Sequence, residues 1–374
     1  MYDQIRENIL FIMLYTVVTT MAMIASCYLL FRRGNAFAPD ITPPVRLRRW
    51  TGFFFASIAL NHVWYMPIFF LSSSEDILMN DLIGGLLDSM TVIPLAIVVL
   101  FAILQDRRRP LWPIAVIVAP LVIGKVWCVA SRSYAILPIL YGYGLLMCIG
   151  LIIYMVRATR QYGRWLRDNY ADLEHKEVWQ SFIVFAITLL VFGIYGIAGS
   201  EPTYLYAVQV GCAVLICYLL WRVETLRDLS IPANDTKEET VTTDNEEDKA
   251  LSLSIRNNVG PLLKVHCEEA QLYLQYDITL SRLAREIGIN RLYLTQYFSS
   301  QGMNYNAYIN DLRINHFISL YREAVATHRP VIAQQLAFES GYRSYSTFSD
   351  AFRRKTSKSV TAWMLAEDEG LRQS

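Results

Sequence analysis

The chain has 374 residues, of which 54% are apolar and 18% charged, and its formal net charge is +1. The apolar share lies slightly above that of soluble domains. The six cysteines form no CxxC pair or Cys/His cluster, so the sequence suggests neither a disulfide framework nor a zinc site. The sequence has no HExxH or GxSxG motif, no glycine-rich phosphate loop and no acidic or histidine cluster of metal spacing, so we predict no catalytic residues, no metal and no cofactor.

The apolar residues gather in the first 222 positions, where seven runs are long enough to cross about 30 Å of hydrocarbon. These runs lie at 8–31, 50–71, 82–104, 111–130, 135–156, 179–199 and 203–222. If the N-terminus is outside, the inner loops carry thirteen Lys and Arg residues and the outer segments carry two, Arg6 and Arg132. Because basic residues favour the cytoplasmic side, residues 1–222 are predicted to form a seven-helix membrane domain with its N-terminus outside and its C-terminus in the cytoplasm.

Three ionisable side chains lie inside the predicted crossings, where such groups are costly and often functional: His62, Asp88 and Lys125. Asp88 and Lys125 lie at a similar depth, near the outer ends of their helices. One interpretation is an ion pair that sets the register of the helices, or an outward-reaching Lys125. The other is a ligand pocket that opens outward, with His62 below it. Both interpretations stay open.

The chain changes character after residue 222. Between 223 and 249 there are three basic and nine acidic side chains, a net charge of −6, and no apolar periodicity. Such a composition is typical of a solvated spacer, so residues 223–250 are predicted to be an acidic cytoplasmic linker. Its first residues, through Leu226 and Leu229, are candidates to extend the last membrane helix.

Beyond residue 250 the pattern becomes one of short amphipathic helices with a period of 3.6 residues. After a helix expected from 261 to about 273, Thr279 is placed to cap a helix that ends at Gly288. Asn290 is placed to cap the next helix, in which Leu294 and Phe298 are four residues apart. A helix, a tight glycine turn and a second helix predict a helix-turn-helix motif.

The motif occurs twice. A long helix near 305–326 follows the first copy. The second copy has the same parts in the same order, namely a helix from Val331 to Glu339, a turn at Gly341, a cap at Ser344, and Phe348 and Phe352 on the second helix.

The stretch from Leu280 to Trp363 resembles the AraC/XylS family of bacterial transcription regulators, and its Asn290–Leu294 run is similar to versions common in Bacteroidetes. The matching residues are Leu283, Ala284, Ile287, Gly288, Leu294, Phe298, Gly302, Tyr308, Leu312, Arg313, Ala337, Gly341, Tyr342, Ser344, Phe348, Phe352 and Trp363. The resemblance covers about a quarter of the chain. It implies a tandem helix-turn-helix DNA-binding domain at 251–366, with a tail at 367–374. The second helix of each motif would enter successive major-groove faces about 34 Å apart.

Carried over position by position, the resemblance implies base-contacting side chains on both second helices, namely Arg291, Leu292, Thr295, Gln296, Tyr345, Ser346, Ser349 and Asp350. Arginine and glutamine suit bidentate contacts with guanine and adenine edges. The expected phosphate contacts are basic side chains around the second motif, namely Arg343, Arg353, Arg354, Lys355 and Lys358. The apolar residues Leu283, Leu294, Phe298, Phe348 and Phe352 are assigned to the core.

The sequence departs from the family pattern at several positions. Asp350 stands where the family more often has a basic or amide side chain, and Met303 replaces an aromatic residue. Ser357, Val360 and Met364 replace the usual Gly, Pro and Arg. The net charge of this half of the chain, with fourteen basic and eleven acidic side chains from residue 250 onward, is only +3. These departures predict weaker or more selective binding by the second motif.

The sequence therefore predicts an all-α, non-enzymatic transcription regulator in the cytoplasmic membrane, whose helix bundle senses a signal or serves as an anchor. The expected partners are double-stranded DNA and the lipid bilayer. A small-molecule ligand at the membrane domain, RNA polymerase and a second copy of the chain are further candidates. The alternative is a membrane transporter or receptor whose cytoplasmic part is a degenerate helix-turn-helix used for protein interaction.

Overall fold

The computed structural model describes residues 9–32, 34–39, 41–174, 176–198, 202–229 and 258–373. Over these ranges the named elements are all helices, which confirms the predicted all-α class. The chain divides into two compact units. Unit 1 comprises Met1–Tyr162 and His175–Pro232, and unit 2 comprises Gly163–Glu174 and Ala233–Ser374.

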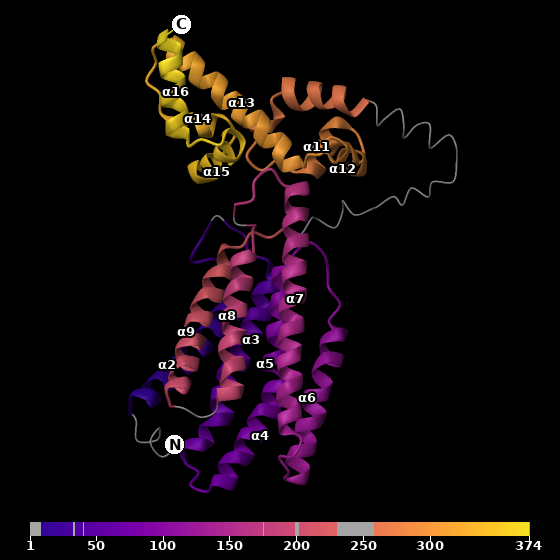
Figure 1. The fold of residues 1–374 in the computed structure, drawn as a ribbon, viewed down its shortest axis with the longest axis vertical. Coiled ribbons are helices and arrows are strands. Elements are labelled where there is room, and N and C mark those ends of the chain that lie inside the picture. Colours follow the sequence, from indigo (N-terminus) through magenta and orange to yellow (C-terminus); the bar gives the residue numbers. More distant parts are fainter. Residues whose placement is uncertain are drawn as a thin grey trace, which may run out of the picture. The chain divides into compact units, whose positions relative to one another are not determined.

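Unit 1 is a bundle of long helices that run roughly alongside one another (Figure 1). Helix α3 packs against α2 and α5, α4 against α6, and α9 against α2 and α8. The elements are α2 (Ile9–Phe31), α3 (Val45–Tyr65), the 3-10 turn η1 (Met66–Phe69), α4 (Ser74–Met90), α5 (Val92–Ile103), α6 (Trp112–Ser131), α7 (Leu137–Asn169), α8 (Trp179–Ala198) and α9 (Pro202–Thr225).

The helices of unit 1 turn much of their apolar surface outward. In the most apolar stretch of α7 only 11% of the residues are buried, and the side chains of Ile139 and Leu146 are 70% and 68% exposed. Helices that are apolar on all sides require an apolar environment around them. Among the described residues, six helical stretches are long and apolar enough to cross a membrane. Unit 1 is thus consistent with a membrane domain.

The count is six rather than the predicted seven because of α8. Its described side chains end at Leu189, and the stretch Trp179–Leu189 is apolar but shorter than a crossing. The backbone of α8 continues as a helix to Ala198. Since the expected orientation of the N-terminus depends on an odd number of crossings, that orientation stays a prediction.

One predicted crossing, 82–104, is not a single helix. Its helix begins earlier, at Ser74, and is interrupted at Thr91, whose backbone has φ −124° and ψ −67°. Pro94 lies in the first turn of α5, where a residue without a backbone N–H is tolerated because that turn has no internal acceptor for it. The hydropathy of the run gave no sign of this break.

Helix α7 is longer than its apolar run predicts. It continues past residue 156 to Asn169 because residues 157–169 are mostly good helix formers such as Arg, Ala, Gln and Leu, although they are no longer apolar. Its last turns, from Gly163, belong to unit 2. The sequence had placed these residues in an inner loop of the membrane half.

The start of the predicted linker is packed against unit 1. Helix α9 ends at Thr225, and the next apolar side chains, Leu226 and Leu229, are 0% and 6% exposed. Residues 230–257, which make up most of the predicted linker, lie outside the described residues.

Unit 2 is built around one long helix, α13, with α11 and α12 near its start and α14, α15 and α16 near its other end (Figure 1). The elements are the π-helical turn η3 (Lys264–Glu269), the 3-10 turn η4 (Leu272–Leu274), α11 (Leu280–Ile287), α12 (Arg291–Ser300), α13 (Tyr305–Ala326), α14 (Ala333–Glu339), α15 (Tyr345–Thr356) and α16 (Val360–Gln373). The helix predicted from 261 to about 273 differs. It is already helical at Asn258, widens into η3, and ends at Glu269, two residues before Gln271, whose φ is +51°.

Candidate nucleic-acid interface

The first pair of short helices is set in place by the caps that the sequence predicted. Thr279 Oγ1 accepts a hydrogen bond from Arg282 N at 3.2 Å where α11 begins. Asn290 Oδ1 accepts one from Leu292 N at 2.9 Å where α12 begins. Between the helices, Gly288 has φ +77°, a conformation in which glycine carries no steric penalty. Helix, turn and helix thus follow the predicted boundaries.

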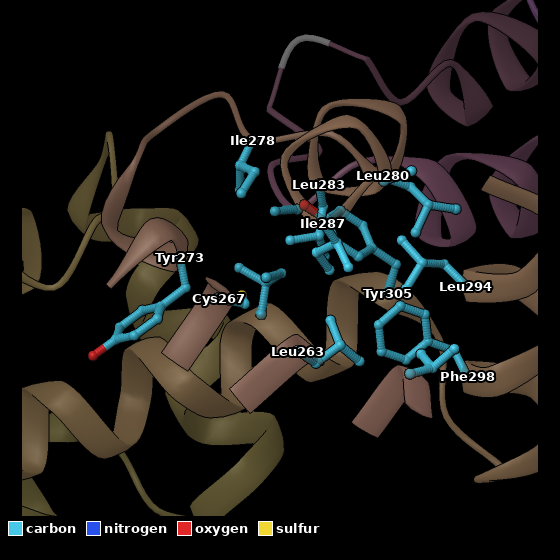
Figure 2. Close-up of a cluster of buried hydrophobic side chains, with 14 residues drawn as sticks. Leu263, Cys267, Tyr273, Ile278, Leu280, Leu283, Ile287, Leu294, Phe298 and Tyr305 are labelled. Atoms are coloured by element: carbon cyan, nitrogen blue, oxygen red, sulfur yellow. The ribbon is translucent and has the colours of Figure 1, made fainter. Parts of the chain in front are cut away.

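The apolar sides of α11 and α12 meet α13 in a core that we call the first core. Leu283 and Leu294 are fully buried, and Phe298 is 2% exposed. Figure 2 shows Leu294 and Phe298 beside Leu263 and Tyr305, which come from the preceding helix and from α13. Burial of each such side chain contributes about 1.5–3 kcal/mol. The burial confirms the predicted inward side of α12 and leaves its other side facing outward.

The second motif repeats this construction with α14 and α15. Ser344 Oγ accepts a hydrogen bond from Thr347 N at 3.3 Å and caps α15. Gly341, at the turn, has φ +87°. Phe348 and Phe352 are fully buried in a separate cluster, the second core, as the sequence predicted. Each motif therefore has its own core, and α13 contributes to both.

Most of the predicted base-contacting side chains are accessible. Those that are exposed are Leu292, Thr295, Gln296, Ser346 and Asp350. Ser349 and Tyr345 are half-buried, and the Tyr345 ring packs against Phe348 with its centroid 5.7 Å away. The exposed residues are three and four positions apart, so they share one side of their helix. Their contact with a base stays a prediction.

Arg291 differs from these residues because its guanidinium already has a partner in its own chain. It is half-buried, and its Nη2 donates a hydrogen bond to Oδ1 of Asn169, the last residue of α7. Asn169 is itself 7% exposed. One of the side chains predicted to contact bases is thus engaged elsewhere in this structure.

The predicted phosphate-contacting side chains are exposed, namely Arg343, Arg353, Arg354, Lys355 and Lys358. Lys355 also has a structural contact, because its Nζ lies 2.9 Å from Asp311 Oδ1 and donates to Asn315 Oδ1 at 3.2 Å, which ties α15 to α13. Three of the five lie in the last turn of α15, where the helix dipole favours positive charge.

Sequence reasoning missed the role of Arg313, which links the two motifs. It is 1% exposed. Its Nε donates to Tyr273 O and its Nη2 to Gln275 O, both at 2.8 Å, and its guanidinium lies over the Tyr342 ring at 5.5 Å. Burial lowers the pKa of Arg313. Because Tyr273 belongs to the first core and Tyr342 to the second, this side chain joins the two cores.

Asn306 was missed as well. It is 7% exposed, and its Nδ2 donates to the carbonyl oxygens of Tyr170 at 3.2 Å and Ala171 at 2.6 Å. A signal was present in the sequence, because Asn306 and Arg313 are seven residues apart and therefore share a side of α13 with buried apolar residues. The residue type did not show what they bind.

In unit 1 the three ionisable side chains that the sequence singled out have different hydrogen-bond partners. His62 is buried, with Nδ1 2.8 Å from Ile58 O and Nε2 3.0 Å from Gln209 Oε1. Lys125 Nζ donates to the carbonyl oxygen of Gly85 at 2.5 Å, and Gly85 lies three residues before Asp88 on α4. The Asp88 carboxylate accepts hydrogen bonds from three side chains of α3, namely Asn61 at 2.7 Å, Trp64 at 3.2 Å and Tyr65 at 3.1 Å. The ion-pair and ligand-pocket interpretations both stay predictions.

The first core supplies a simple reporter of folding, the thiol of Cys267. It is fully buried, and burial raises its pKa to about 12. Because the thiolate is the reactive form, we expect iodoacetamide near pH 8 to leave Cys267 unmodified in the folded protein and to modify it after unfolding in urea. Mass spectrometry of the peptide that contains Cys267 measures this. Rapid modification of the native protein would contradict the packing of the first core.

Comparison with known families gives one match. Residues 283–365 match the family model described as a helix-turn-helix domain. The matched range begins inside α11 and ends inside α16, so it contains α12, α13, α14 and α15 whole and all of α11 except its first turn. Comparisons with curated proteins and with solved structures found no match.

Proposed function

We propose that this chain, whose residues 283–365 are an AraC-type helix-turn-helix domain, is a transcription regulator anchored in the cytoplasmic membrane. The observation that carries the proposal is that the described part of the same chain includes six helical stretches long and apolar enough to cross a membrane. A DNA-binding domain functions in the cytoplasm, so the membrane concerned is the cytoplasmic one. The strong excess of basic residues in the predicted inner loops supports an orientation in which the C-terminal half of the chain lies in the cytoplasm.

On this proposal, α12 and α15 are the helices that enter the major groove. Gln296 is the best-placed reader in the first motif because it is exposed and its amide suits an adenine edge. Ser346, Ser349 and Asp350 are the corresponding candidates in the second motif. The exposed basic side chains around α15 are suited to phosphates, which set the position of a protein on DNA without reading its sequence.

The membrane unit would act as the receiver of a signal. A ligand changes DNA binding only if it binds two states of the chain with different affinity. The identity of such a ligand, contact with RNA polymerase and pairing with a second copy of the chain stay predictions. A kinase-like domain is absent from the sequence, so transfer of a signal would occur within one chain.

The test is the occupancy of the chromosome by the intact, membrane-bound protein, measured by crosslinking and immunoprecipitation. We expect discrete sites for the wild-type protein and a loss of occupancy for Gln296→Ala combined with Arg291→Ala. With the purified intact protein and a recovered site, Gln296→Ala alone should weaken binding by about 1–3 kcal/mol and relax the preference at one base pair.

The matched control is Gln301→Ala, an exposed glutamine just beyond the other end of α12. It should leave both occupancy and base preference unchanged. If the protein is present in the membrane and occupies no discrete site under any growth condition, the proposal is wrong. Transport of a solute by vesicles that contain the protein would then favour the alternative, a transporter or receptor with a degenerate helix-turn-helix.

A further inference from the structure

The segment Gly163–Glu174, which comprises the last turns of α7 and the loop after them, is part of unit 2. We call it the α7 extension. Its residues from Asn169 to Glu174 contact the domain at several successive positions, through both backbone and side chains. The domain therefore contacts this segment as it would contact a bound peptide, although the segment belongs to the same chain.

The middle of the α7 extension is held by its backbone. The buried side chain of Asn306 donates to the carbonyl oxygens of Tyr170 and Ala171, and Tyr170 forms an isolated antiparallel bridge with Thr279. Ala171 is 2% exposed and belongs to the first core. A buried amide left without an acceptor is costly. The Asn306 side chain is therefore suited to bind a peptide backbone at the position that Tyr170 and Ala171 occupy.

The ends of the contact reach the first turn of both second helices. Asn169 accepts a hydrogen bond from Arg291, the first residue of α12. Glu174 accepts one from Thr347 Oγ1, in the first turn of α15, at 3.4 Å. DNA phosphates and base edges are expected at these same turns, and helix N-termini favour anionic groups. The Asn169 amide and the Glu174 carboxylate therefore lie where DNA would have to bind.

We propose that the α7 extension is an intramolecular competitor of DNA. While it is docked, Arg291 is withheld from the bases and the start of α15 is occupied; when it leaves, both second helices are available. This inference rests on the proposed function. The extension is continuous with the apolar part of α7, because α7 is one helix from Leu137 to Asn169, and this continuity is a covalent link between the membrane unit and the DNA-reading domain.

The composition of the contact suits a reversible switch. Of the described residues of the α7 extension, the first core includes only Ala171, a small side chain. The buried Asp172 carboxylate adds an electrostatic attraction to Arg313. The contacts that Asn169 and Glu174 make with Arg291 and Thr347 are hydrogen bonds to oxygen acceptors, which phosphate oxygens are able to replace. Coupling between two sites in one protein typically changes affinity by about 5–150-fold, and we expect the docked extension to act within that range.

A disulfide tests the proposal by locking the docked state in the intact chain. Residues paired across an antiparallel bridge have Cα atoms about 4.5–5.5 Å apart, which is within the range that a disulfide spans. The variant is Tyr170→Cys with Thr279→Cys, in lipid nanodiscs, and the probe is a random-sequence pool of duplex DNA. Oxidation should weaken DNA binding at least about tenfold, and reduction should restore it. Each single cysteine variant is a control and should show no change with oxidation.

A release variant tests the opposite direction without altering residues 258–373. Asn169→Ala combined with Ala171→Asp removes the partner of Arg291 and places a charge in the first core, so the extension should leave the domain. DNA binding should then become several-fold tighter than that of the wild-type protein. Cys267 should stay unmodified by iodoacetamide, which would show that the domain is still folded.

The outcomes separate this inference from the proposed function. If the double cysteine variant forms its disulfide and binds DNA equally well when oxidised and reduced, the α7 extension does not compete with DNA, while the regulator proposal stands. Failure of the disulfide to form would also overturn the inference, because it would contradict the docked state. If neither the wild-type protein nor the cysteine variants nor the release variant binds DNA, the proposed function itself is wrong.

Discussion

Replacing Arg313 with methionine is expected to lower the free energy of unfolding of unit 2 by about 2–5 kcal/mol. Methionine keeps much of the volume of the side chain but donates no hydrogen bond. The carbonyl oxygens of Tyr273 and Gln275 would lose the donors that now lie 2.8 Å away. Each buried acceptor left without a donor costs about 1–3 kcal/mol. The ring of Tyr342 would also lose the cation above it.

The matched control for this change is Arg322→Met on the same helix. Arg322 is 60% exposed and forms an ion pair with Glu367 at 2.8 Å. Pairs exposed to this degree contribute about 0–1 kcal/mol, so the control should change little. Pulse proteolysis of the intact protein across a urea series reports the midpoint for unit 2. Equal midpoints for the two variants would show that Arg313 does not hold the cores together.

Loss of Arg313 should affect DNA binding beyond its effect on stability. The two motifs are expected to bind one DNA molecule at two sites, and the gain from joint binding depends on a fixed geometry between them. Arg313 contacts residues of both cores. At temperatures where Arg313→Met is still folded, its affinity for DNA should therefore fall more than that of Arg322→Met.

The parts of unit 2 that could be predicted are those set by short-range chemistry. Thr279, Asn290 and Ser344 cap their helices as expected because a side chain needs to reach only two or three residues along the chain. Phe348 and Phe352 are buried as expected because a spacing of four residues defines one side of a helix.

The parts that could not be predicted depend on partners far along the chain. The acceptors of Arg313 lie about forty residues earlier, and those of Asn306 lie 135 and 136 residues earlier. The sequence of the α7 extension has no apolar period that would mark it as a docking peptide. The break at Thr91 could not be predicted either, because hydropathy is averaged over a window of residues and does not locate a single backbone kink.

Substituting Gly341 with alanine is expected to destabilise unit 2 by about 2–5 kcal/mol, and Gly288 with alanine by about 1–2 kcal/mol. Both glycines end the first helix of a motif, and both have positive φ, +87° and +77°. A side chain at either position therefore meets the same backbone strain. A Cβ at Gly341 would in addition lie 2.8 Å from the Cα and the carbonyl oxygen of Leu274, whereas a Cβ at Gly288 meets open space.

Asparagine separates the two causes, because it tolerates the left-handed conformation better than alanine but still carries a Cβ. Gly288→Asn should recover most of the stability that Gly288→Ala loses. Gly341→Asn should recover little, because the contact with Leu274 is with backbone, which cannot rotate away as a flexible side chain can. The urea midpoint of unit 2 in the four variants measures this.

Leu274 lies between the two carbonyl groups that Arg313 binds, so Gly341→Asn should also loosen the Arg313 contact. Combined with Arg313→Met, it should cost less than the sum of the two single changes, since residues that share a contact are not additive. Full additivity would mean that the turn at Gly341 and the Arg313 link are independent, and that the two motifs are joined elsewhere.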